Sequence, residues 1–225
     1  MSISTYRVQY NTIEFGDQDI HVRTLRDRQQ FSDDEGKAAD LGISSASWPH
    51  FGVIWQSGHV LAHIMSDYDV TNERILEVGC GIGLASLVLN HRKEDISATD
   101  HHPEAEDFMQ QNTELNDDRN IPFVCTGWTD EESCLGKFDL IIGSDILYEG
   151  EHVEQLSQFI DQHAQDSAEV ILVDPGRGHH AKFSKAMVKL GYTHSQQTTV
   201  DPEYLEGDYR GQVLSYQRTT TIEIQ

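Results

Sequence analysis

Residues 75–87 read ILEVGCGIGLASL, and this stretch decides the fold. An apolar strand is followed by three glycines at alternate positions, Gly79, Gly81 and Gly83, and a helical pattern begins immediately after them. Glycine is used where a backbone must turn sharply or let a ligand approach closely. The stretch therefore predicts a strand, a tight turn and a helix, with a ligand lying over the turn.

The glycine turn does not fit a phosphate-binding loop. A dinucleotide-binding turn reads G-x-G-x-x-G, and Leu84 stands at the position of its third glycine. A P-loop ends in Gly-Lys-Ser/Thr, and no lysine lies between Arg74 and Arg92. Glu77, two residues before the first glycine, would repel a pyrophosphate. An acidic residue there suits a ligand with a positively charged part.

A second acidic residue, Asp100, ends the next predicted strand, roughly 20 residues beyond the glycines. Ligands of open α/β sheets bind at the C-terminal ends of the strands, where a carboxylate can accept hydrogen bonds from two ribose hydroxyls. The glycine turn, Glu77 and Asp100 together describe a nucleoside with a cationic amino-acid tail, which is S-adenosylmethionine. The alternative is an ordinary strand–helix turn beside a surface aspartate.

The pattern of a strand followed by a helix repeats along the chain. Near-continuous apolar strands joined by helices indicate a parallel sheet covered on both faces. The last two predicted strands have no long helix between them and should form an antiparallel hairpin. We therefore predict an α/β, Rossmann-like sheet of seven mostly parallel strands with an antiparallel last strand. The predicted strands are residues 74–79, 95–100, 121–127, 138–145, 168–174, 192–200 and 212–219, and the helices are 84–92, 103–116, 151–165 and 179–191.

The region before this sheet divides into three parts. Alternating segments around the turn GDQD predict an N-terminal β-hairpin over residues 5–25. Residues 26–47 are polar and indicate a mobile connector. A helix should follow, with Ser57 as its N-cap and an apolar stripe beginning at Val60. The expected organisation is a hairpin and connector over residues 1–47 and a main domain over residues 48–225.

The length fits one domain, and the composition favours a soluble protein of the cytoplasm. No apolar run approaches the roughly 20 residues of a membrane helix, the N-terminus lacks a signal-peptide pattern, and the three cysteines have no CxxC spacing. Zinc-type Cys/His spacing and HExxH are also absent from the sequence, so no metal site is expected.

The chain is strongly acidic. It has 16 Lys and Arg against 38 Asp and Glu, a net charge of −22, which argues against nucleic acid as the main partner. An acidic surface can steer a lysine-bearing protein partner, although solubility or a salty cytoplasm explains the same charge.

At this point the chain resembles a known superfamily. The E-x-G-x-G-x-G turn and the acid that ends the second strand are similar to those of the class I, seven-strand S-adenosylmethionine-dependent methyltransferases, over roughly residues 48–220. That resemblance implies S-adenosylmethionine as cofactor and a reversed seventh strand, in agreement with the terminal hairpin predicted above.

Three further stretches resemble the family-16 protein lysine methyltransferases. They are FGVIWQSGHVLA at 51–62, CTGWTD at 125–130, and FDLIIGSDILYEGE at 138–151 with its D-x-x-Y signature. The run Asp174 to Arg177, D-P-G-R, resembles the branch of the electron-transfer-flavoprotein lysine methyltransferases and the nicotinamide methyltransferase-like proteins. The implied cofactor-binding residues are Trp55, Glu77, Gly79, Gly81, Asp100, His101, Trp128 and Ser144, and the implied catalytic residues are Asp145 and Tyr148.

The chemistry of Asp145 and Tyr148 agrees with that implication. An amine must be neutral to accept a methyl group, whereas free lysine has a pKa of about 10.4. A carboxylate and a phenol three residues apart, on one face of a helical turn, can orient the remaining hydrogens of the amine. The alternatives are that Asp145 caps the following helix and that Tyr148 is a core residue. Trp55 and Trp128 could equally be packing residues.

Three functions remain open from the sequence. The first is methylation of a protein lysine, with substrate choice expected to lie in the N-terminal hairpin, the connector and residues 201–212. The second is methylation of a small amine, with residues 31–42 of the connector folded over the pocket as a lid. The third is a non-catalytic module that binds S-adenosylmethionine, which an intact Asp145 and Tyr148 pair disfavours.

Overall fold

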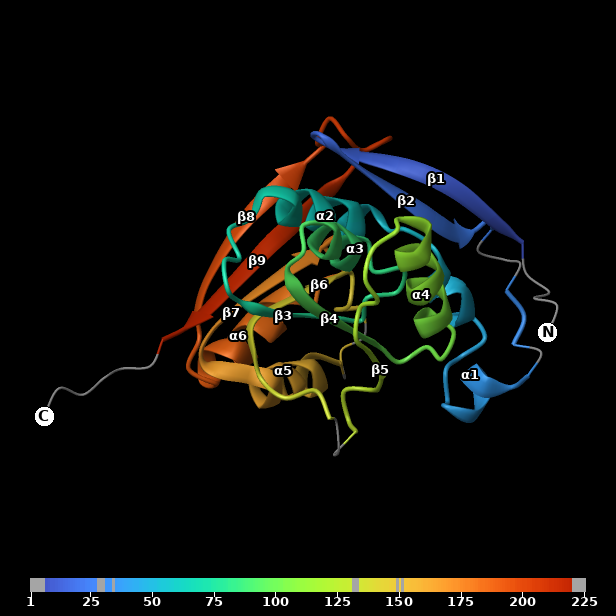
Figure 1. Cartoon of the computed structure of the whole chain (residues 1–225). Coiled ribbons are helices and arrows are strands. Elements are labelled where there is room, and N and C mark those ends of the chain that lie inside the picture. The colour runs from blue at the N-terminus through green and yellow to red at the C-terminus, as the bar shows by residue number, and fades with distance from the viewer. Residues whose placement is uncertain are drawn as a thin grey trace, which may run out of the picture.

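The protein is built around one central sheet. The computed structural model describes residues 7–27, 31–33, 35–130, 134–148, 150 and 152–219. Figure 1 shows this sheet with helices on its two faces and a separate hairpin along one side. The strand order is β5-β4-β3-β6-β7-β9-β8, and β9 is antiparallel to both of its neighbours, whereas the other pairs are parallel. The strands are β3 Arg74–Val78, β4 Asp95–Asp100, β5 Phe123–Cys125, β6 Phe138–Ser144, β7 Ala164–Asp174, β8 Thr193–Val200 and β9 Arg210–Arg218.

This arrangement confirms the predicted fold class. The glycine stretch supplies the central strand β3, whose side chains alternate between the two faces because successive residues of a strand point in opposite directions. Ile75 belongs to the apolar cluster on one face, and Leu76 and Val78 belong to the cluster on the other. Because β3 pairs in parallel with both β4 and β6, the C-terminal ends of these three strands lie side by side at one edge of the sheet.

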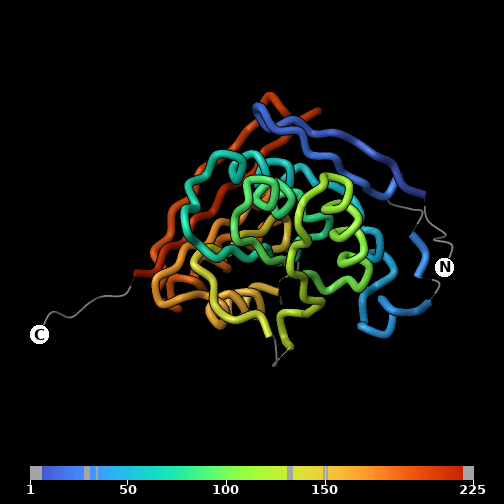
Figure 2. Tube along the Cα trace, viewed as in Figure 1, coloured from blue at the N-terminus to red at the C-terminus, as the bar shows by residue number. Residues whose placement is uncertain are grey.

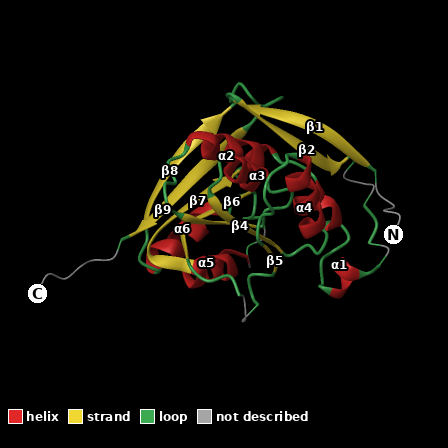
Figure 3. Ribbon diagram, viewed as in Figure 1, coloured by secondary structure: helices red, strands yellow, loops and turns green. Residues whose placement is uncertain are grey.

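The helices divide between the two faces, as Figure 3 illustrates. Buried residues of α2, α3 and α4 pack in one apolar cluster, and those of α5 and α6 pack in the other. Both layers of the predicted α/β sandwich are therefore present. The helices are α1 Lys37–Asp40, the 3₁₀ helix η1 Trp48–Gly52, α2 Gln56–Asp67, α3 Leu84–His91, α4 Ala105–Leu115, α5 His152–His163 and α6 His180–Lys189.

The N-terminal hairpin is confirmed, with strands β1 Val8–Phe15 and β2 Gln18–Leu25. Residues 5 and 6 of the predicted hairpin lie outside the described residues. Asn112 of α4 and Asn116, the residue that caps the C-terminus of α4, hold the outer edge of β2 in place of a neighbouring strand. The Asn112 amide accepts from the Arg23 backbone N–H at 2.7 Å and donates to the Arg23 carbonyl at 3.2 Å. Asn116 does the same at His21, at 2.8 and 2.7 Å.

The hairpin also contributes to the main core. Phe15, Ile20, Val22 and Leu25 are buried in the same apolar cluster as α2, α3 and α4. The division of the chain into two segments at residue 47 stays a prediction.

Figure 2 traces the connector from the hairpin through α1 and back to α2. It contains one helical turn, with Ala38 fully buried and the backbone N–H of Ala39 donating to the Asp33 carboxylate at 2.8 Å. The polar connector expected from the sequence therefore includes a helix that the sequence pattern did not reveal. Residues 28–30 and 34 of the connector lie outside the described residues.

Several predicted boundaries are wrong by a few residues, and two of them show the reason. Ser57 is not an N-cap: α2 begins at Gln56, Trp55 occupies the cap position in an extended conformation, and the buried Ser57 hydroxyl lies 3.3 Å from that of Tyr209. The helix predicted to reach residue 165 ends at His163, because Ala164 is fully buried and pairs with Phe138 as the first residue of β7. In both cases tertiary contacts override the local pattern.

Candidate functional site

The glycine turn joins β3 to α3 in a conformation that requires glycine. Gly79, Gly81 and Gly83 have φ values of 60°, 53° and 68°, in the left-handed region that other L-residues avoid. Space is also restricted, since a Cβ at Gly79 would lie 2.7 Å from Cγ2 of Ile146 and one at Gly81 would lie 3.0 Å from the Phe51 carbonyl oxygen. The spacing of the three glycines is thus explained by backbone geometry and packing together.

Glu77 lies beneath this turn and is 3% exposed. Its Oε2 accepts hydrogen bonds from the Ser86 backbone N–H at 2.9 Å and from the Ser86 hydroxyl at 2.5 Å. Burial raises the pKa of Glu77 to about 7, and the two bonds from Ser86 oppose that rise. Glu77 therefore connects β3 to the first turn of α3.

Asp100 ends β4 directly beside the turn. Its Oδ2 accepts the Gly81 backbone N–H at 2.7 Å and its Oδ1 accepts the His102 N–H at 2.8 Å. Burial raises the pKa of this carboxyl, and the backbone hydrogen bonds lower it in part. The neighbouring His101 ring is exposed, with Nε2 3.3 Å from the Leu41 carbonyl of the connector. Asp100 thus fixes the shape of the glycine turn, and His101 joins the turn to the connector.

Asp145 and Tyr148 follow the C-terminal end of β6. Asp145 has a φ of 55°, and its backbone N–H donates to the Val173 carbonyl at 2.9 Å. Residues 146–148 have no regular structure, so the predicted helical turn is wrong. Neither alternative holds: α5 begins only at His152, so Asp145 is not its cap, and Tyr148 is 44% exposed, so it is not a core residue.

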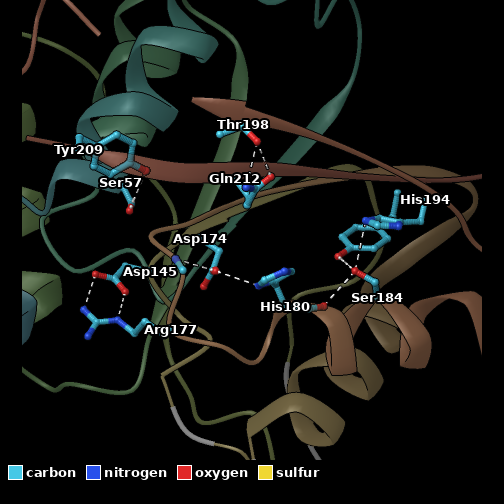
Figure 4. A network of polar contacts seen from close by, with 12 residues as sticks. Ser57, Asp145, Asp174, Arg177, His180, Ser184, His194, Thr198, Tyr209 and Gln212 are labelled. Carbon is cyan, nitrogen blue, oxygen red and sulfur yellow. Dashed lines mark hydrogen bonds and ion pairs between the residues drawn. The ribbon is translucent and has the colours of Figure 1, made fainter. Parts of the chain in front are cut away.

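A guanidinium that the sequence did not assign to the site holds Asp145. Arg177 Nε donates to Oδ1 of Asp145 at 2.5 Å and its Nη2 donates to Oδ2 at 2.8 Å, which Figure 4 shows as a two-bond fork. The loop after β7 presents Arg177, and the Gly176 N–H in that loop donates to the Asp174 carboxylate at 2.9 Å. The D-P-G-R run is visible in the sequence, but nothing in it indicates that its arginine reaches Asp145.

The two tryptophans lie at different ends of the site. Trp128 lies against the glycine turn, since its Cζ2 would be 3.8 Å from a Cβ at Gly79. Trp55 donates its indole N–H to the His50 carbonyl at 3.0 Å, and its ring lies 5.9 Å from the guanidinium carbon of Arg177. Trp128 is therefore placed beside the glycine turn and Trp55 beside the ion pair.

One cavity of about 490 Å³ brings these groups together. Its volume falls within the range of small-molecule sites. Ile43 and Ser47 of the connector form part of its wall, as does Arg177, none of which was expected from the sequence. All ten residues predicted from the sequence line it: Trp55, Glu77, Gly79, Gly81, Asp100, His101, Trp128, Ser144, Asp145 and Tyr148.

A profile of a lysine methyltransferase family matches residues 42–189. The chain belongs to this family. The resemblance inferred from the glycine turn and the D-x-x-Y signature is thereby confirmed, and with it S-adenosylmethionine as the cofactor on which the family depends.

Two curated relatives are similar over part of their length. The chain is 27% identical over 139 residues to the protein N-lysine methyltransferase METTL21A of Danio rerio, covering 57% of this chain and 63% of that protein. It is 26% identical over 130 residues to a putative methyltransferase-like protein 21E pseudogene of Homo sapiens, covering 52% of this chain and 48% of that sequence. The matches span less than two thirds of either relative.

Solved structures with the same fold include other methyltransferases. Magnesium protoporphyrin IX methyltransferase from Synechocystis PCC 6803, solved with bound S-adenosylmethionine, has a TM-score of 0.60 at 21% identity, over 84% of this chain and 99% of that one. The 16S rRNA N2 G1207 methyltransferase of T. thermophilus has a TM-score of 0.63 at 12% identity, over 96% and 52%. At such identities the likeness concerns the fold alone.

The residues of the cavity fit S-adenosylmethionine. Among the described residues no cluster of three or more His, Cys, Asp or Glu could hold a metal ion, and in the same ranges no helix has the length and apolar character to cross a membrane. The cavity combines carboxylates at the ends of two strands, a bare glycine backbone and an aromatic wall at Trp128. These are complementary to a ligand with a cationic tail, a ribose and a flat base.

Proposed function

We propose that this chain is an S-adenosylmethionine-dependent N-methyltransferase whose acceptor is a lysine of a protein. The observation that carries the proposal is the position of Asp145 and Tyr148 on the same cavity as the glycine turn and Asp100. The groups proposed to bind the donor and the acceptor thus face one cavity, as a direct transfer between two substrates requires.

The cofactor would lie against the ends of β3 and β4. S-adenosylmethionine supplies a methyl group on a positively charged sulfur. Glu77 and the backbone of Gly79 and Gly81 would hold its methionine part, and Trp128 would cover the adenine. Asp100 would hold the ribose, because each carboxylate oxygen that already accepts one backbone N–H retains a second lone-pair site.

The acceptor amine would lie between Asp145 and Tyr148, above Ser144. These groups accept or donate hydrogen bonds and so direct the nitrogen lone pair at the methyl carbon. With the cofactor bound, its methyl carbon would bond to this nitrogen while the C–S electron pair stayed on sulfur, and the nitrogen would then release a proton to water. The contribution of Asp145 and Tyr148 is chiefly alignment, since an ordinary carboxylate is a weak base toward an ammonium ion.

Two observations favour a protein lysine as acceptor. Tyr148 is 44% exposed, so the acceptor end of the cavity is open to a side chain arriving from outside. The net charge of −22 complements a lysine-rich partner and disfavours nucleic acid. The similarity to the Danio rerio protein N-lysine methyltransferase agrees with this choice.

A small amine is the second candidate acceptor. The connector contributes Ile43 and Ser47 to the cavity wall, and the Leu41 carbonyl lies 3.3 Å from His101 Nε2. The connector thus covers part of the cavity, as a lid over a small substrate would. Within both proposals residues 48–225 act as the methyltransferase domain, and the protein acts in the cytoplasm.

Binding and labelling experiments test the proposal in sequence. Calorimetry with S-adenosylhomocysteine should give binding at micromolar concentration that Asp100→Ala removes, and absence of binding to the unaltered protein would refute the cofactor site. Radiolabelled S-adenosylmethionine with cell lysate should then label a protein band, which mass spectrometry identifies. Label confined to low-mass compounds would favour the small amine, and no label in either fraction would favour a non-catalytic module.

A further inference from the structure

The ion pair between Arg177 and Asp145 occupies the acceptor end of the cavity. Both oxygens of Asp145 accept from the guanidinium, at 2.5 and 2.8 Å. The Asp145 side chain is only 8% exposed, whereas that of Arg177 is 41% exposed. The carboxylate is therefore largely withdrawn from water and is neutralised by one partner that water still reaches.

The loop after β7 is built to present this guanidinium. Gly176 and Gly178 flank Arg177 with φ values of 89° and 92°, in the left-handed region, and a Cβ at either would meet nothing within 4 Å. The glycines are thus required by backbone shape and not by crowding. The Asp174 carboxylate, 1% exposed, fixes the turn through the Gly176 N–H. Arg177 is consequently directed at Asp145 by its own loop.

A neutralised Asp145 solves a problem that an unpaired carboxylate would create. A lysine enters as an ammonium ion, and a nearby unpaired carboxylate stabilises that charged form by direct attraction between opposite charges. The ammonium has no lone pair and cannot accept a methyl group. An acceptor site with a bare aspartate would bind its substrate tightly in an unreactive form.

We infer that Arg177 is a positioning residue that neutralises Asp145, so that the acceptor amine reacts in its neutral form and is not trapped as an ammonium ion. The inference deepens the proposed function and rests on it for the identity of the acceptor. A guanidinium remains charged at every physiological pH, so it can serve this purpose without titrating itself. The planar fork also holds both carboxylate oxygens in one orientation toward the acceptor.

Other charged and titratable groups near this ion pair come from several elements. Asp174 and Tyr148 interact electrostatically with Arg177. Tyr209, in the loop before β9, interacts electrostatically with both Asp145 and Asp174. The further titratable groups that line the cavity are His50, Glu77, Cys80, Asp100, His101, His102 and His152. Arg177 is the one lysine or arginine among the described residues that line the cavity. Substituting it therefore removes the positive charge that neutralises Asp145.

A binding experiment tests the inference without requiring methyl transfer. The probe is n-butylammonium at pH 7, a mimic of the lysine side chain, followed by NMR through the indole N–H of Trp55. Arg177→Gln, and Arg177→Met as a second uncharged variant, should bind the probe about tenfold more tightly than the unaltered protein. Adding Asp145→Asn to either variant should remove the gain.

Two further variants serve as controls. Arg177→Lys keeps the positive charge and should bind the probe like the unaltered protein. Arg74→Gln is a matched control, since Arg74 also pairs with an aspartate and lies 4.8 Å from an aromatic ring, at the opposite edge of the sheet. Unchanged S-adenosylhomocysteine affinity in every variant establishes that the cavity is intact. Probe affinity that does not rise in either uncharged variant overturns the inference.

A kinetic experiment adds a readout that a purely structural role would not move. With the labelled lysate protein as acceptor, Arg177→Gln should lower KM and also lower kcat, by about tenfold at pH 7. The limb of the kcat–pH profile should move about one unit to higher pH, because kcat reports ionisation in the bound complex. A loss of kcat that is equal at every pH contradicts the inference and leaves the proposed methyl transfer in place. No transfer by the unaltered protein refutes the proposed function, while the binding experiment still decides the role of Arg177.

Discussion

The two ends of the cavity are built in different ways. At the end where we propose that the cofactor binds, Glu77, the three glycines and Asp100 lie on or beside adjacent buried strands, and their contacts are mostly with backbone groups. At the end that we propose for the acceptor, Asp145 and Tyr148 lie in an irregular segment, and the main partner of Asp145 is a side chain from another loop. One end is determined by the main chain of the sheet, and the other by side chains on loops.

This difference predicts that the two ends of the cavity tolerate substitutions to different degrees. A site made by buried backbone accepts few substitutions, because each glycine is fixed by its φ and each carboxylate by amide hydrogen bonds. A site made by side chains on loops can change its acceptor through single substitutions while the fold stays intact. Changes at the cofactor end should therefore alter cofactor affinity and stability, and changes at the acceptor end should alter rate.

Asp145→Asn should have the largest effect. Asparagine tolerates the left-handed backbone of this position, so the loop stays in place while the negative charge is lost. Methyl transfer should fall about a thousandfold, because the amine loses the carboxylate that aligns its lone pair with the methyl carbon. S-adenosylhomocysteine affinity should stay within about twofold, because the cofactor contacts lie at the other end.

The matched control is Asp139→Asn, on the same strand β6 at the opposite edge of the sheet, where Asp139 accepts the Arg74 backbone N–H at 2.9 Å. Radiolabel transfer and calorimetry give the two measurements. A parallel loss of cofactor affinity in Asp145→Asn would mean that the two ends are not separate sites.

Glu77→Gln should change the pH dependence of stability. Burial raises the folded-state pKa of Glu77 to about 7, above its ordinary value of 4.5. The folded state therefore holds the proton more tightly, and the stability associated with it is present below pH 4.5 and lost as the pH rises through 7. The loss over that window is about 3 kcal/mol.

Glutamine is uncharged and can still accept from Ser86, so the variant should lack this decline. Urea unfolding between pH 5 and pH 8 should give a difference between variant and unaltered protein that widens with pH. Comparing the two proteins removes the opposing effect of His63 and His102, whose pKa values burial lowers to about 4. Glu203→Gln, at an exposed position, should show no such widening.

Gly81→Ala should weaken S-adenosylhomocysteine binding about 30-fold, an effect of roughly 2 kcal/mol. The alanine must adopt a φ of 53°, and its Cβ would lie 3.0 Å from the Phe51 carbonyl oxygen. Gly16→Ala is the control, because Gly16 has a φ of 66° and nothing within 4 Å of the added atom. Both variants should lose about 1 kcal/mol of stability from backbone strain, but only Gly81→Ala should lose cofactor affinity in calorimetry. Equal binding by the two variants would show that the turn does not contact the ligand.

Tyr148→Phe should have the smallest effect, a fall of about tenfold in kcat, which corresponds to one hydrogen bond of about 1.4 kcal/mol. Tyr148 is 44% exposed, so its hydroxyl can be removed without disturbing the core. Thermal unfolding and S-adenosylhomocysteine affinity should therefore not change. An unaltered kcat would assign the alignment of the amine to Asp145 alone.

The sequence predicts the sheet, and the meeting of the glycine turn with Glu77 and Asp100, well for a physical reason. The strands are continuous apolar runs, and the glycines and acids that follow them belong to short motifs whose geometry is local. Ligand-binding ends of parallel strands meet at one edge, so Glu77, Asp100 and Asp145 could be placed on a common cavity from strand order alone.

The acceptor end and several boundaries depend on contacts between distant segments. Arg177 reaches Asp145 across 32 positions of sequence, and no pattern in either segment indicates the pairing. Ser57 resembles an N-cap by residue type, but contact with Tyr209 places it inside the helix. The segment 145–148 resembles a helical turn by its spacing, but the left-handed Asp145 excludes a helix.

The asparagines that hold the hairpin have a consequence for behaviour in salt. Asn112 and Asn116 attach β2 through uncharged amides, with four hydrogen bonds to the backbone. Added salt screens charges but not neutral amide contacts. A chain of net charge −22 repels itself most strongly in dilute buffer. The hairpin should therefore remain attached across ionic strengths at which surface ion pairs elsewhere on the molecule open and close.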